Sequence, residues 1–300
     1  MNMLGGLLGF FFATKILRKP LPLLANFKLT YQCNLTCAGC PFHLRSQEED
    51  ASMSWVKACD CIDRLKNMGC RIVIFEGGEP LLWRDGNRRF VDLVRYAKKH
   101  FVCVGATTNG TLGLDVPTDV LWVSIDGIRD THNELRSNSY ENILNNIRSS
   151  THNKLFIHFT MNRKNWRELG ELVRTLSDVE QVKGFTVQLF YPYNQGEDEL
   201  ALSRQERKDA LLYVMDLKRR GYPVLNSQWG LNAMIDNTWT CHDFLLANVD
   251  PDGRISKGCY VAGRGDVRCA DCGFTPVAEA SGAYDFVPGA LAAGWRIFLS

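Results

Sequence analysis

The chain has no excess of charge of either sign. Its 35 lysine and arginine residues nearly balance 33 aspartate and glutamate residues, which leaves a net charge of +2. A domain that binds nucleic acid typically carries a strongly basic surface, so nucleic acid is not the expected partner. Internal repeats and low-complexity segments are also missing, which argues against a repeat protein or a disordered tail. We expect a small-molecule or lipid partner.

Long apolar runs are missing as well. The apolar segment Met3–Leu17 meets Lys15 and Arg18 before it reaches the ~20 apolar residues that cross a bilayer. No basic residue precedes this segment and no small-residue cleavage site follows it, so it is a poor signal peptide. Two alternatives stay open for residues 1–22. One is a shallow anchor on the inner face of the membrane, and the other is a helix packed on the protein itself.

Cysteine, by contrast, is abundant, with 11 residues in a chain of 300. Disulfide frameworks are typical of short secreted domains, whereas this chain is long and shows no usable export signal. Thiol or metal chemistry in a reducing compartment fits the composition better. The sequence therefore predicts a cytoplasmic protein, with peripheral membrane contact as the open alternative.

Six short runs predict buried strands, because they are rich in β-branched or aromatic residues and end at polar or glycine-containing turns. These runs are Phe27–Tyr31, Arg71–Phe75, Val102–Ala106, Leu121–Ile125, Leu155–Thr160 and Phe185–Phe190. Helical patterns lie between most of them, at Trp55–Met68, Arg89–His100, Tyr140–Ser150 and Trp166–Leu176. Alternating strands and helices predict a parallel sheet with right-handed crossovers, here a partial (β/α)6 TIM-type barrel. Ligands of such sheets bind at the carboxyl ends of the strands.

The pattern changes after the barrel, which we assign to residues 23–221. Residues 222–300 contain short apolar pieces, cysteines and glycines, and they predict a small C-terminal cysteine-rich domain. Within it, Leu246–Val249 and Arg254–Ser256 flank the turn sequence Asp250–Gly253. Proline and glycine suit that turn, so a β-hairpin is expected there.

Three cysteines directly follow the first predicted strand, at positions 33, 37 and 40. Three thiolates can bind three irons of a [4Fe–4S] cluster and leave the fourth iron open to a ligand. The alternative is structural zinc, which needs four ligands, and His43 is the only nearby supplement to Cys33, Cys37 and Cys40. The pattern favours the cluster over a non-catalytic zinc scaffold.

The CxxxCxxC spacing resembles the signature of the radical S-adenosylmethionine (SAM) superfamily. Glu76-Gly77-Gly78-Glu79-Pro80 follows the second strand and is similar to that family's GGEP motif, which holds the amino group of SAM. Glycines permit a close backbone approach, and a carboxylate matches an ammonium group. The resemblance covers about residues 24–190. It implies an oxygen-sensitive enzyme that takes one electron from a donor such as flavodoxin or ferredoxin and cleaves SAM to a 5′-deoxyadenosyl radical.

The same resemblance implies further residues of the SAM pocket. They are the polar residues at the ends of strands three, four and five, namely Thr108, Asn109, Ser124, Asp126, Thr160 and Asn162. Taken singly, each of them is more often a helix cap or a turn residue. The family often places an aromatic residue before the third cysteine, where this chain has Gly39, and Phe42 is the expected substitute.

Four cysteines in the C-terminal extension form a second set: Cys241, Cys259, Cys269 and Cys272. Four thiolates suit a closed site for zinc or for an iron–sulfur cluster, and the ligand type alone does not decide between them. The resemblance to radical SAM proteins with SPASM or twitch extensions favours an auxiliary cluster.

The tail also resembles that of adenosylhopane synthase-like enzymes of hopanoid biosynthesis. Together with the apolar segments at both ends of the chain, this likeness makes modification of an isoprenoid or other lipid at the membrane surface the leading hypothesis for the substrate. The alternative is a peptide-modifying or enzyme-maturing radical SAM protein, since a cysteine-rich tail with a hairpin is also typical of those enzymes.

Overall fold

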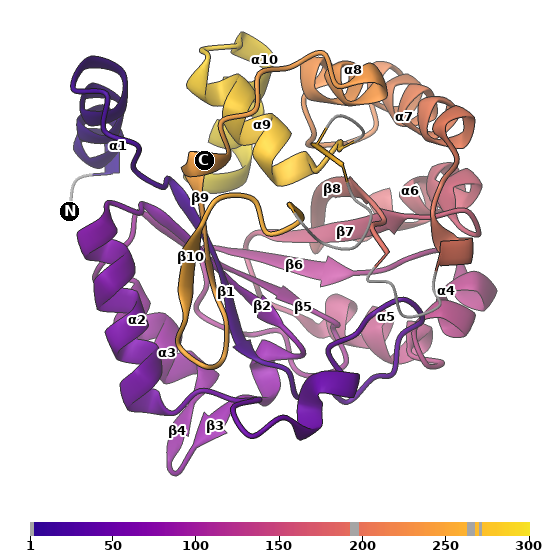
Figure 1. The fold of residues 1–300 in the computed structure, drawn as a ribbon. Coiled ribbons are helices and arrows are strands. Elements are labelled where there is room, and N and C mark those ends of the chain that lie inside the picture. The colour runs from indigo at the N-terminus through magenta and orange to yellow at the C-terminus, as the bar shows by residue number, and fades with distance from the viewer. Residues whose placement is uncertain (1–2, 193–197, 263–267, 270–271) are drawn as a thin grey trace.

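The computed structural model describes residues 3–192, 198–262, 268–269 and 272–300. Residues 1–2 of the predicted N-terminal segment and Ala270–Asp271 of the tail cysteine motif lie outside the described residues. Eight strands form one curved sheet in the order β10-β9-β1-β2-β5-β6-β7-β8 (Figure 1). Their bounds are Leu24–Thr30 (β1), Ile72–Gly77 (β2), Cys103–Thr108 (β5), Val120–Ser124 (β6), Leu155–Met161 (β7), Val182–Leu189 (β8), Leu246–Val249 (β9) and Ile255–Lys257 (β10). The predicted partial barrel is confirmed, with β1, β2, β5, β6, β7 and β8 as its six strands.

Helices cover the outer face of this sheet (Figure 1). They are α2 (Trp55–Met68), α3 (Phe90–Ala97), α4 (Arg129–Leu135), α5 (Tyr140–Ser149), α6 (Leu169–Ser177) and α7 (Arg204–Arg219). The bounds of α2 follow from local chemistry. Ser54 accepts a hydrogen bond from the Lys57 N–H at the start, and Gly69 ends the helix in the left-handed region with φ 101°. A two-residue ladder of β3 (Arg84–Asp85) and β4 (Arg88–Arg89) lies outside the main sheet.

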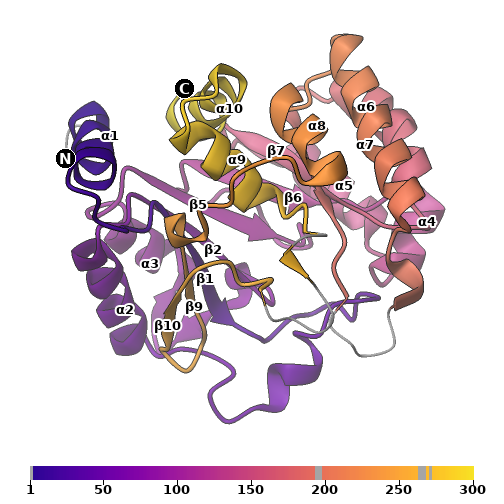
Figure 2. The same ribbon diagram turned by 45° about the horizontal axis from the view of Figure 1, so that its top comes forward.

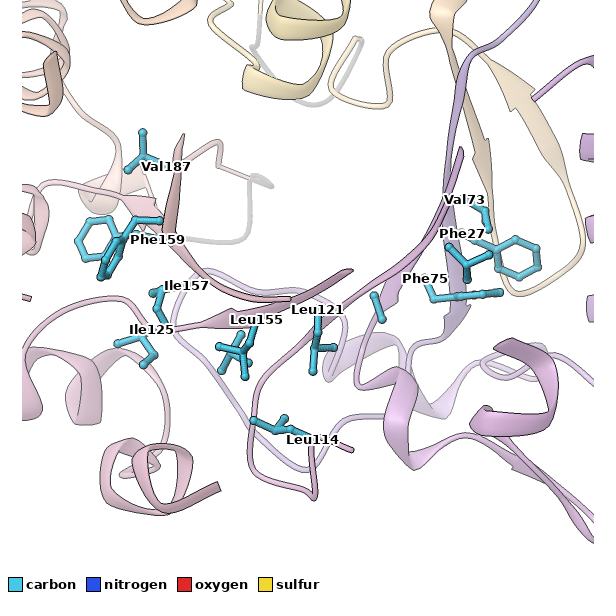
Figure 3. Close-up of a cluster of buried hydrophobic side chains, with 14 of the residues drawn as sticks. Phe27, Val73, Phe75, Leu114, Leu121, Ile125, Leu155, Ile157, Phe159 and Val187 are labelled. Carbon is cyan, nitrogen blue, oxygen red and sulfur yellow. The ribbon is translucent and has the colours of Figure 1, made fainter. Parts of the chain in front are cut away.

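Alternation along the strands separates the core from the inner face of the barrel. Phe27, Phe75, Ile157 and Phe159 point outward under the helices and are fully buried, and the rings of Phe27 and Phe75 lie 5.1 Å apart (Figure 3). Residues of the opposite parity line the concave inner face, because successive side chains of a strand point to opposite sides. The hydrophobic core therefore fixes which side chains face inward.

The inner face is itself divided. Near the amino ends of the strands it is apolar, and the C-terminal part of the chain covers it, including α9 (Thr275–Tyr284) and α10 (Pro288–Gly294) (Figure 2). Trp122 of β6, for example, packs against Phe298 with a centroid distance of 6.0 Å. Near the carboxyl ends the inner face is polar. Helix α8 (Gln228–Asp236) follows α7 and packs against α7, α9 and α10.

The predicted hairpin is confirmed and joins the main sheet. β10 pairs antiparallel with β9, and β9 pairs in parallel with β1, with Leu246 opposite Leu24. The side chain of Asn26 donates to that of Asn248 at 3.2 Å across this edge. The extension thus contributes strands to the same sheet as the barrel, and the division at residue 221 stays a prediction.

The N-terminal segment forms α1 (Met3–Phe11), which continues as a π-helix from Phe12 to Ile16. One side of it packs on the protein, where Phe10 is fully buried with Leu245 and Tyr284. Within the described ranges, no helix combines the length and the apolar character needed to traverse a bilayer.

Candidate functional site

A cavity of about 220 Å³ opens at the carboxyl ends of the barrel strands. Twelve of the fourteen predicted residues of the cluster and SAM sites line it. They are Cys33, Cys37, Cys40, Phe42, Gly77, Gly78, Thr108, Asn109, Ser124, Asp126, Thr160 and Asn162. Segments far apart in the sequence meet here because parallel strands end at one edge of the sheet. The two exceptions are Glu79 and Pro80.

The three thiols of the first set lie on the loop after β1. The loop is fixed on α4 by the Ala38 N–H, which donates to the Leu135 carbonyl at 2.9 Å. At its start, the Asn109 amide lies 3.6 Å from the Cys33 sulfur. Burial raises the pKa of Cys37 to about 11, and the nearby Arg136 guanidinium opposes that rise. A positive charge beside these thiols favours anionic sulfur ligands at the cavity.

This donor set is of the kind that a [4Fe–4S] cluster with one open iron requires: three thiols from one loop, at a cavity, beside a buried cation. In the part of the chain that the structure describes, no three histidine, cysteine, aspartate or glutamate side chains are grouped closely enough to hold a single metal ion. A cubane is bound differently, because each thiolate binds its own iron.

Gly77 and Gly78 form a cradle where β2 ends. Gly77 has φ 119°, a conformation that side chains with a Cβ rarely adopt. A Cβ at Gly78 would collide with the backbone of the neighbouring loop at Gln32. Only glycine lets β2 and the start of the thiol loop approach so closely, and this approach leaves backbone polar groups bordering the cavity.

Glu79 differs from the prediction that its carboxylate faces a ligand. The side chain is fully buried, and it accepts hydrogen bonds from the Thr108 hydroxyl at 2.8 Å and from the Asn109 N–H at 2.7 Å. The Leu81 N–H donates a third at 3.0 Å, at the start of the 3-10 helix Pro80–Leu82. Burial raises the pKa of Glu79 to about 7 despite these donors. Its carboxylate joins the ends of β2 and β5, while Glu76 lines the cavity instead.

A buried ion pair on the opposite wall was not predicted. Arg136, just after α4, donates through Nε to Asp126 Oδ2 at 2.6 Å, and the side chains are 17% and 9% exposed. Asp126 also accepts from the Thr160 N–H at 2.8 Å. Burial lowers the pKa of the Arg136 guanidinium, but Asp126 and the thiols of Cys37 and Cys40 outweigh it, so the net shift is upward. Arg136 is therefore a fixed positive charge in the cavity wall.

Sequence reasoning also missed several inward-facing residues, and strand alternation could have found two of them. His158 lies two positions before Thr160 on β7 and shares its face, and Gln188 holds the matching place on β8 opposite Thr160. Burial lowers the pKa of His158 to about 4, so its imidazole is neutral near pH 7. Tyr191 and Tyr260, which also line the cavity, come from irregular segments that carry no periodic signal.

None of the four tail cysteines, all of which the structure describes, lines this cavity. Partial burial and the Asp243 carboxylate raise the pKa of Cys241 to about 12, and the thiols of Cys259, Cys272 and Cys269 add to the rise. The four thiols are therefore within electrostatic range of one another, but no three of these described side chains are close enough to hold a single metal ion. The described side chains are thus arranged as two separate thiol sets.

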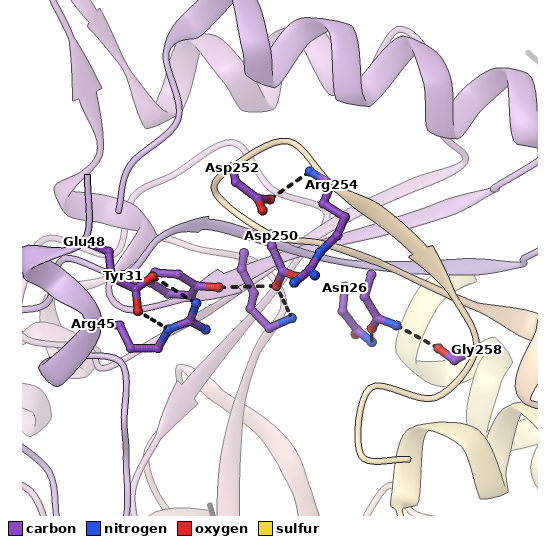
Figure 4. A network of polar contacts seen from close by, with 10 residues as sticks. Asn26, Tyr31, Arg45, Glu48, Asp250, Asp252, Arg254 and Gly258 are labelled. Carbon is purple, nitrogen blue, oxygen red and sulfur yellow. Dashed lines mark hydrogen bonds and ion pairs between the residues drawn. The ribbon is translucent and has the colours of Figure 1, made fainter. Parts of the chain in front are cut away.

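A second cavity adjoins the first. Phe42 and Tyr260 line both, and the second is also lined by charged residues of β1, of the thiol loop and of the tail hairpin. Asp250 organises it. Its carboxylate accepts from Lys28 at 3.1 Å and from Arg254 at 3.0 Å, and the Tyr31 hydroxyl lies 3.4 Å away (Figure 4). These contacts tie the hairpin to the strand that precedes the thiol loop.

Residues 27–176 match the model of the family described as the radical SAM superfamily. Among curated proteins, the chain is similar to Fe-coproporphyrin III synthase of Methanosarcina barkeri, with 25% identity over 66% of this chain and 53% of that protein. It is also similar to the antilisterial bacteriocin subtilosin biosynthesis protein AlbA of Bacillus subtilis, with 26% identity over 60% of this chain and 42% of that protein. The chain spans about half the length of these curated relatives.

Among solved structures, the fold is similar to that of Streptococcus suis SuiB. The complex of SuiB with S-adenosylmethionine gives a TM-score of 0.64, with 15% identity over 83% of this chain and 63% of that one. The complex with precursor peptide SuiA also gives 0.64, with 14% identity over 86% of this chain and 64% of that one. This likeness concerns the fold alone, whereas the family match covers half of the chain. The chain therefore belongs to the radical SAM superfamily, a family of enzymes that bind a [4Fe–4S] cluster and S-adenosylmethionine.

Proposed function

We propose that this radical SAM enzyme modifies a peptide, or matures a protein or peptide-derived cofactor. Curated relatives include subtilosin and sporulation killing factor maturation proteins and mycofactocin maturases, and SuiB was solved with a precursor peptide. These relatives favour the alternative of the sequence analysis over its leading hypothesis of lipid modification. The resemblance of the tail to hopanoid enzymes stays a prediction.

The observation that carries the proposal is the chemistry of the two adjoining cavities. An isoprenoid has no charged or hydrogen-bonding groups that could pair with charged walls, and burying such walls unpaired is costly. Here the walls carry the Lys28–Asp250–Arg254 cluster in one cavity and the Asp126–Arg136 pair in the other. Backbone amides and charged side chains of a peptide match such walls. Because Phe42 and Tyr260 border both cavities, an extended chain can occupy the second while one residue reaches the first.

In this proposal Cys33, Cys37 and Cys40 hold the catalytic cluster, and Gly77, Gly78 and the polar strand ends hold SAM. When bound, the cluster and SAM together supply a carbon-centred radical, with an electron from a donor such as flavodoxin or ferredoxin. The chain's own residues position the substrate and enclose the site. Arg136 places a fixed positive charge at the cavity, where it suits a carboxylate group, and Asp126 fixes the guanidinium.

The tail thiols Cys241, Cys259, Cys269 and Cys272 are proposed to hold an auxiliary iron–sulfur cluster, with zinc as the alternative. Their effect on the pKa of Cys241 supports a shared neighbourhood. No three of these described side chains are close enough to hold a single metal ion, so a cluster, in which each thiolate binds its own iron, fits them better than zinc. The enzyme is proposed to work in a reducing cytoplasm, because both thiol sets need free cysteines.

Iron and sulfide content of the anaerobically reconstituted protein tests these assignments. We expect about eight irons in the parent, and about four in the triple variant Cys33→Ala, Cys37→Ala and Cys40→Ala, as two cubanes predict. The matched control Cys59→Ala changes a cysteine outside both sets and should retain about eight. Loss of all iron in the triple variant would show that the tail thiols hold no iron–sulfur cluster, and zinc would then be their expected ligand.

SAM cleavage under dithionite tests the reaction. The parent and Cys59→Ala should form 5′-deoxyadenosine, and the triple variant should not. A pool of ribosomally encoded precursor peptides should raise the rate, whereas extracted isoprenoid lipid should leave it unchanged. Stimulation by the lipid instead of the peptides would refute the proposed substrate class.

A further inference from the structure

The N-terminal helix exposes an apolar stripe that the fold leaves uncovered. Leu8, Phe12 and Ile16 are spaced four residues apart, and they are 64%, 58% and 67% exposed. A spacing of four places side chains on one side of a helix. The other side is occupied, because Phe10 and Thr14 are buried against the body of the protein. The helix is thus attached along one side and apolar on the side that faces solvent.

Neighbouring side chains enlarge this stripe. Leu17 follows it and is 51% exposed, and Phe286 is 56% exposed with its ring 5.4 Å from that of Phe11. We refer to Leu8, Phe12, Ile16, Leu17 and Phe286 as the N-terminal apolar surface. Single exposed apolar residues are ordinary, but five large ones on one helix and the segment packed against it indicate an interaction site.

The charge that directly follows the helix is positive, and Asp285, which precedes Phe286, faces Lys15 and His242. Arg18 and Lys19 are exposed directly after the helix, and the first acidic residue of the chain is Glu48. Lys15 lies within the helix, 3.3 Å from Asp285 and 3.5 Å from the centre of the Tyr284 ring, so its charge is already paired. Arg18 and Lys19 therefore provide the positive rim that suits an anionic surface.

The size of the surface favours lipid over a second protein. At these exposures the five side chains offer on the order of 500 Å² of apolar area, below the ~800 Å² that each partner of a stable protein complex buries. The helix is also too short to cross a bilayer. A short helix with an apolar side and a cationic rim matches shallow insertion among lipid headgroups.

The surface lies at the end of the barrel opposite the cavity. α1 leads into the amino end of β1, whereas the thiol loop leaves its carboxyl end (Figures 1 and 2). The seven residues of β1 alone separate these ends by roughly 20 Å. We propose that the N-terminal apolar surface docks the enzyme on an anionic lipid bilayer and leaves the mouth of the cavity facing the aqueous side. This orientation requires no lipid substrate, so it stands independently of the proposed function.

Vesicle flotation of the full reconstituted chain tests the docking. We use vesicles of phosphatidylcholine alone and vesicles with one third phosphatidylglycerol, at low and high salt. The parent should float with the anionic vesicles and detach as salt rises. Phe12→Glu with Ile16→Glu should weaken binding at least tenfold, and Arg18→Glu with Lys19→Glu should abolish the preference for phosphatidylglycerol.

The matched control is Val56→Glu on α2, because Val56 is 75% exposed and lies outside this surface. It should float like the parent, and thermal unfolding should show that all variants fold. Absence of parent binding to anionic vesicles at low salt would overturn the proposal, as would undiminished binding of the Phe12→Glu, Ile16→Glu variant. A dimer that this variant dissociates would assign the surface to a second copy instead. SAM cleavage should continue on vesicles, and its loss there would overturn the orientation.

Discussion

The Asp126–Arg136 pair allows the strongest quantitative test of how the cavity is built. The chain offers a second ion pair of equal length in a different environment. Arg136 and Asp126 are separated by 2.6 Å and are 17% and 9% exposed, whereas Arg129 and Glu141 are separated by 2.6 Å and are 64% and 49% exposed. The two ion pairs therefore have the same N···O distance but differ in how far they are buried.

Removing one partner of a buried pair leaves an uncompensated charge in a poor solvent, which costs about 3 to 5 kcal/mol. Asp126 keeps its hydrogen bond from the Thr160 N–H, so we expect the lower end, about 3 kcal/mol, for Arg136→Ala. An exposed pair is solvated and screened, so Arg129→Ala should cost less than about 1 kcal/mol.

Urea unfolding of the cluster-free protein, followed by circular dichroism, measures both variants against the parent. The comparison rests on the difference between the two, which is expected to be at least about 2 kcal/mol. Equal costs would show that the burial of the Asp126–Arg136 pair contributes nothing, and the account of a fixed charge in the cavity wall would fail.

Three further predictions follow from single side chains. Burial raises the pKa of Glu79 from 4.5 to about 7, so between these pH values the folded state binds a proton that the unfolded chain has released. The free energy of unfolding should therefore fall as the pH rises from 4.5 to about 7, and Glu79→Gln should flatten this fall. Gly78→Ala should cost about 1 to 3 kcal/mol by overpacking and should abolish SAM cleavage. The Tyr191 hydroxyl is buried with no hydrogen-bond partner among the described residues, so Tyr191→Phe should stabilise the ligand-free protein by about 1 kcal/mol.

Each of these predictions has a control. Unfolding midpoints measured across this pH range test the prediction for Glu79. If the midpoint of Glu79→Gln changes with pH as steeply as that of the parent, the raised pKa of Glu79 is contradicted. Gly113→Ala should be silent, since nothing lies within 4 Å of a Cβ there. Tyr96→Phe should lower stability by about 1 kcal/mol, because that hydroxyl donates to Asp63 at 3.0 Å. The same sign of effect for Tyr191→Phe and Tyr96→Phe would contradict the unpartnered state of Tyr191.

The barrel was predictable because its strands are short, β-branched and buried on both faces. Helix α2 has the bounds that the pattern predicts, Trp55 to Met68, since a serine cap and a left-handed glycine mark its ends. The pairing of β9 with β1 was not predictable, because no local signal in four residues specifies a partner more than 200 positions away. Tertiary packing, and not the local strand propensity of these residues, determines the pairing of β9 with β1.

The site shows the same division. The thiol loop and the strand ends meet at one cavity because each follows a strand, which the sequence shows, and their roles stay predictions. The burial of Glu79 was not predictable, because a motif gives the residue but not the direction of its side chain, which accepts three hydrogen bonds from backbone and hydroxyl donors. Arg136 was missed, because its partner Asp126 lies ten residues away, on the other side of α4.

The pairing of β1 with β9 also affects the order of events during synthesis. Asn26 and Asn248, which bond across this pair, are 222 positions apart. At ~5 to 20 residues per second, the ribosome releases the later strand roughly 10 to 45 seconds after the earlier one. Throughout that interval the strand that carries the thiol loop has an open edge. An open edge of this kind can pair with other chains, so the nascent enzyme is exposed to aggregation until β9 covers it.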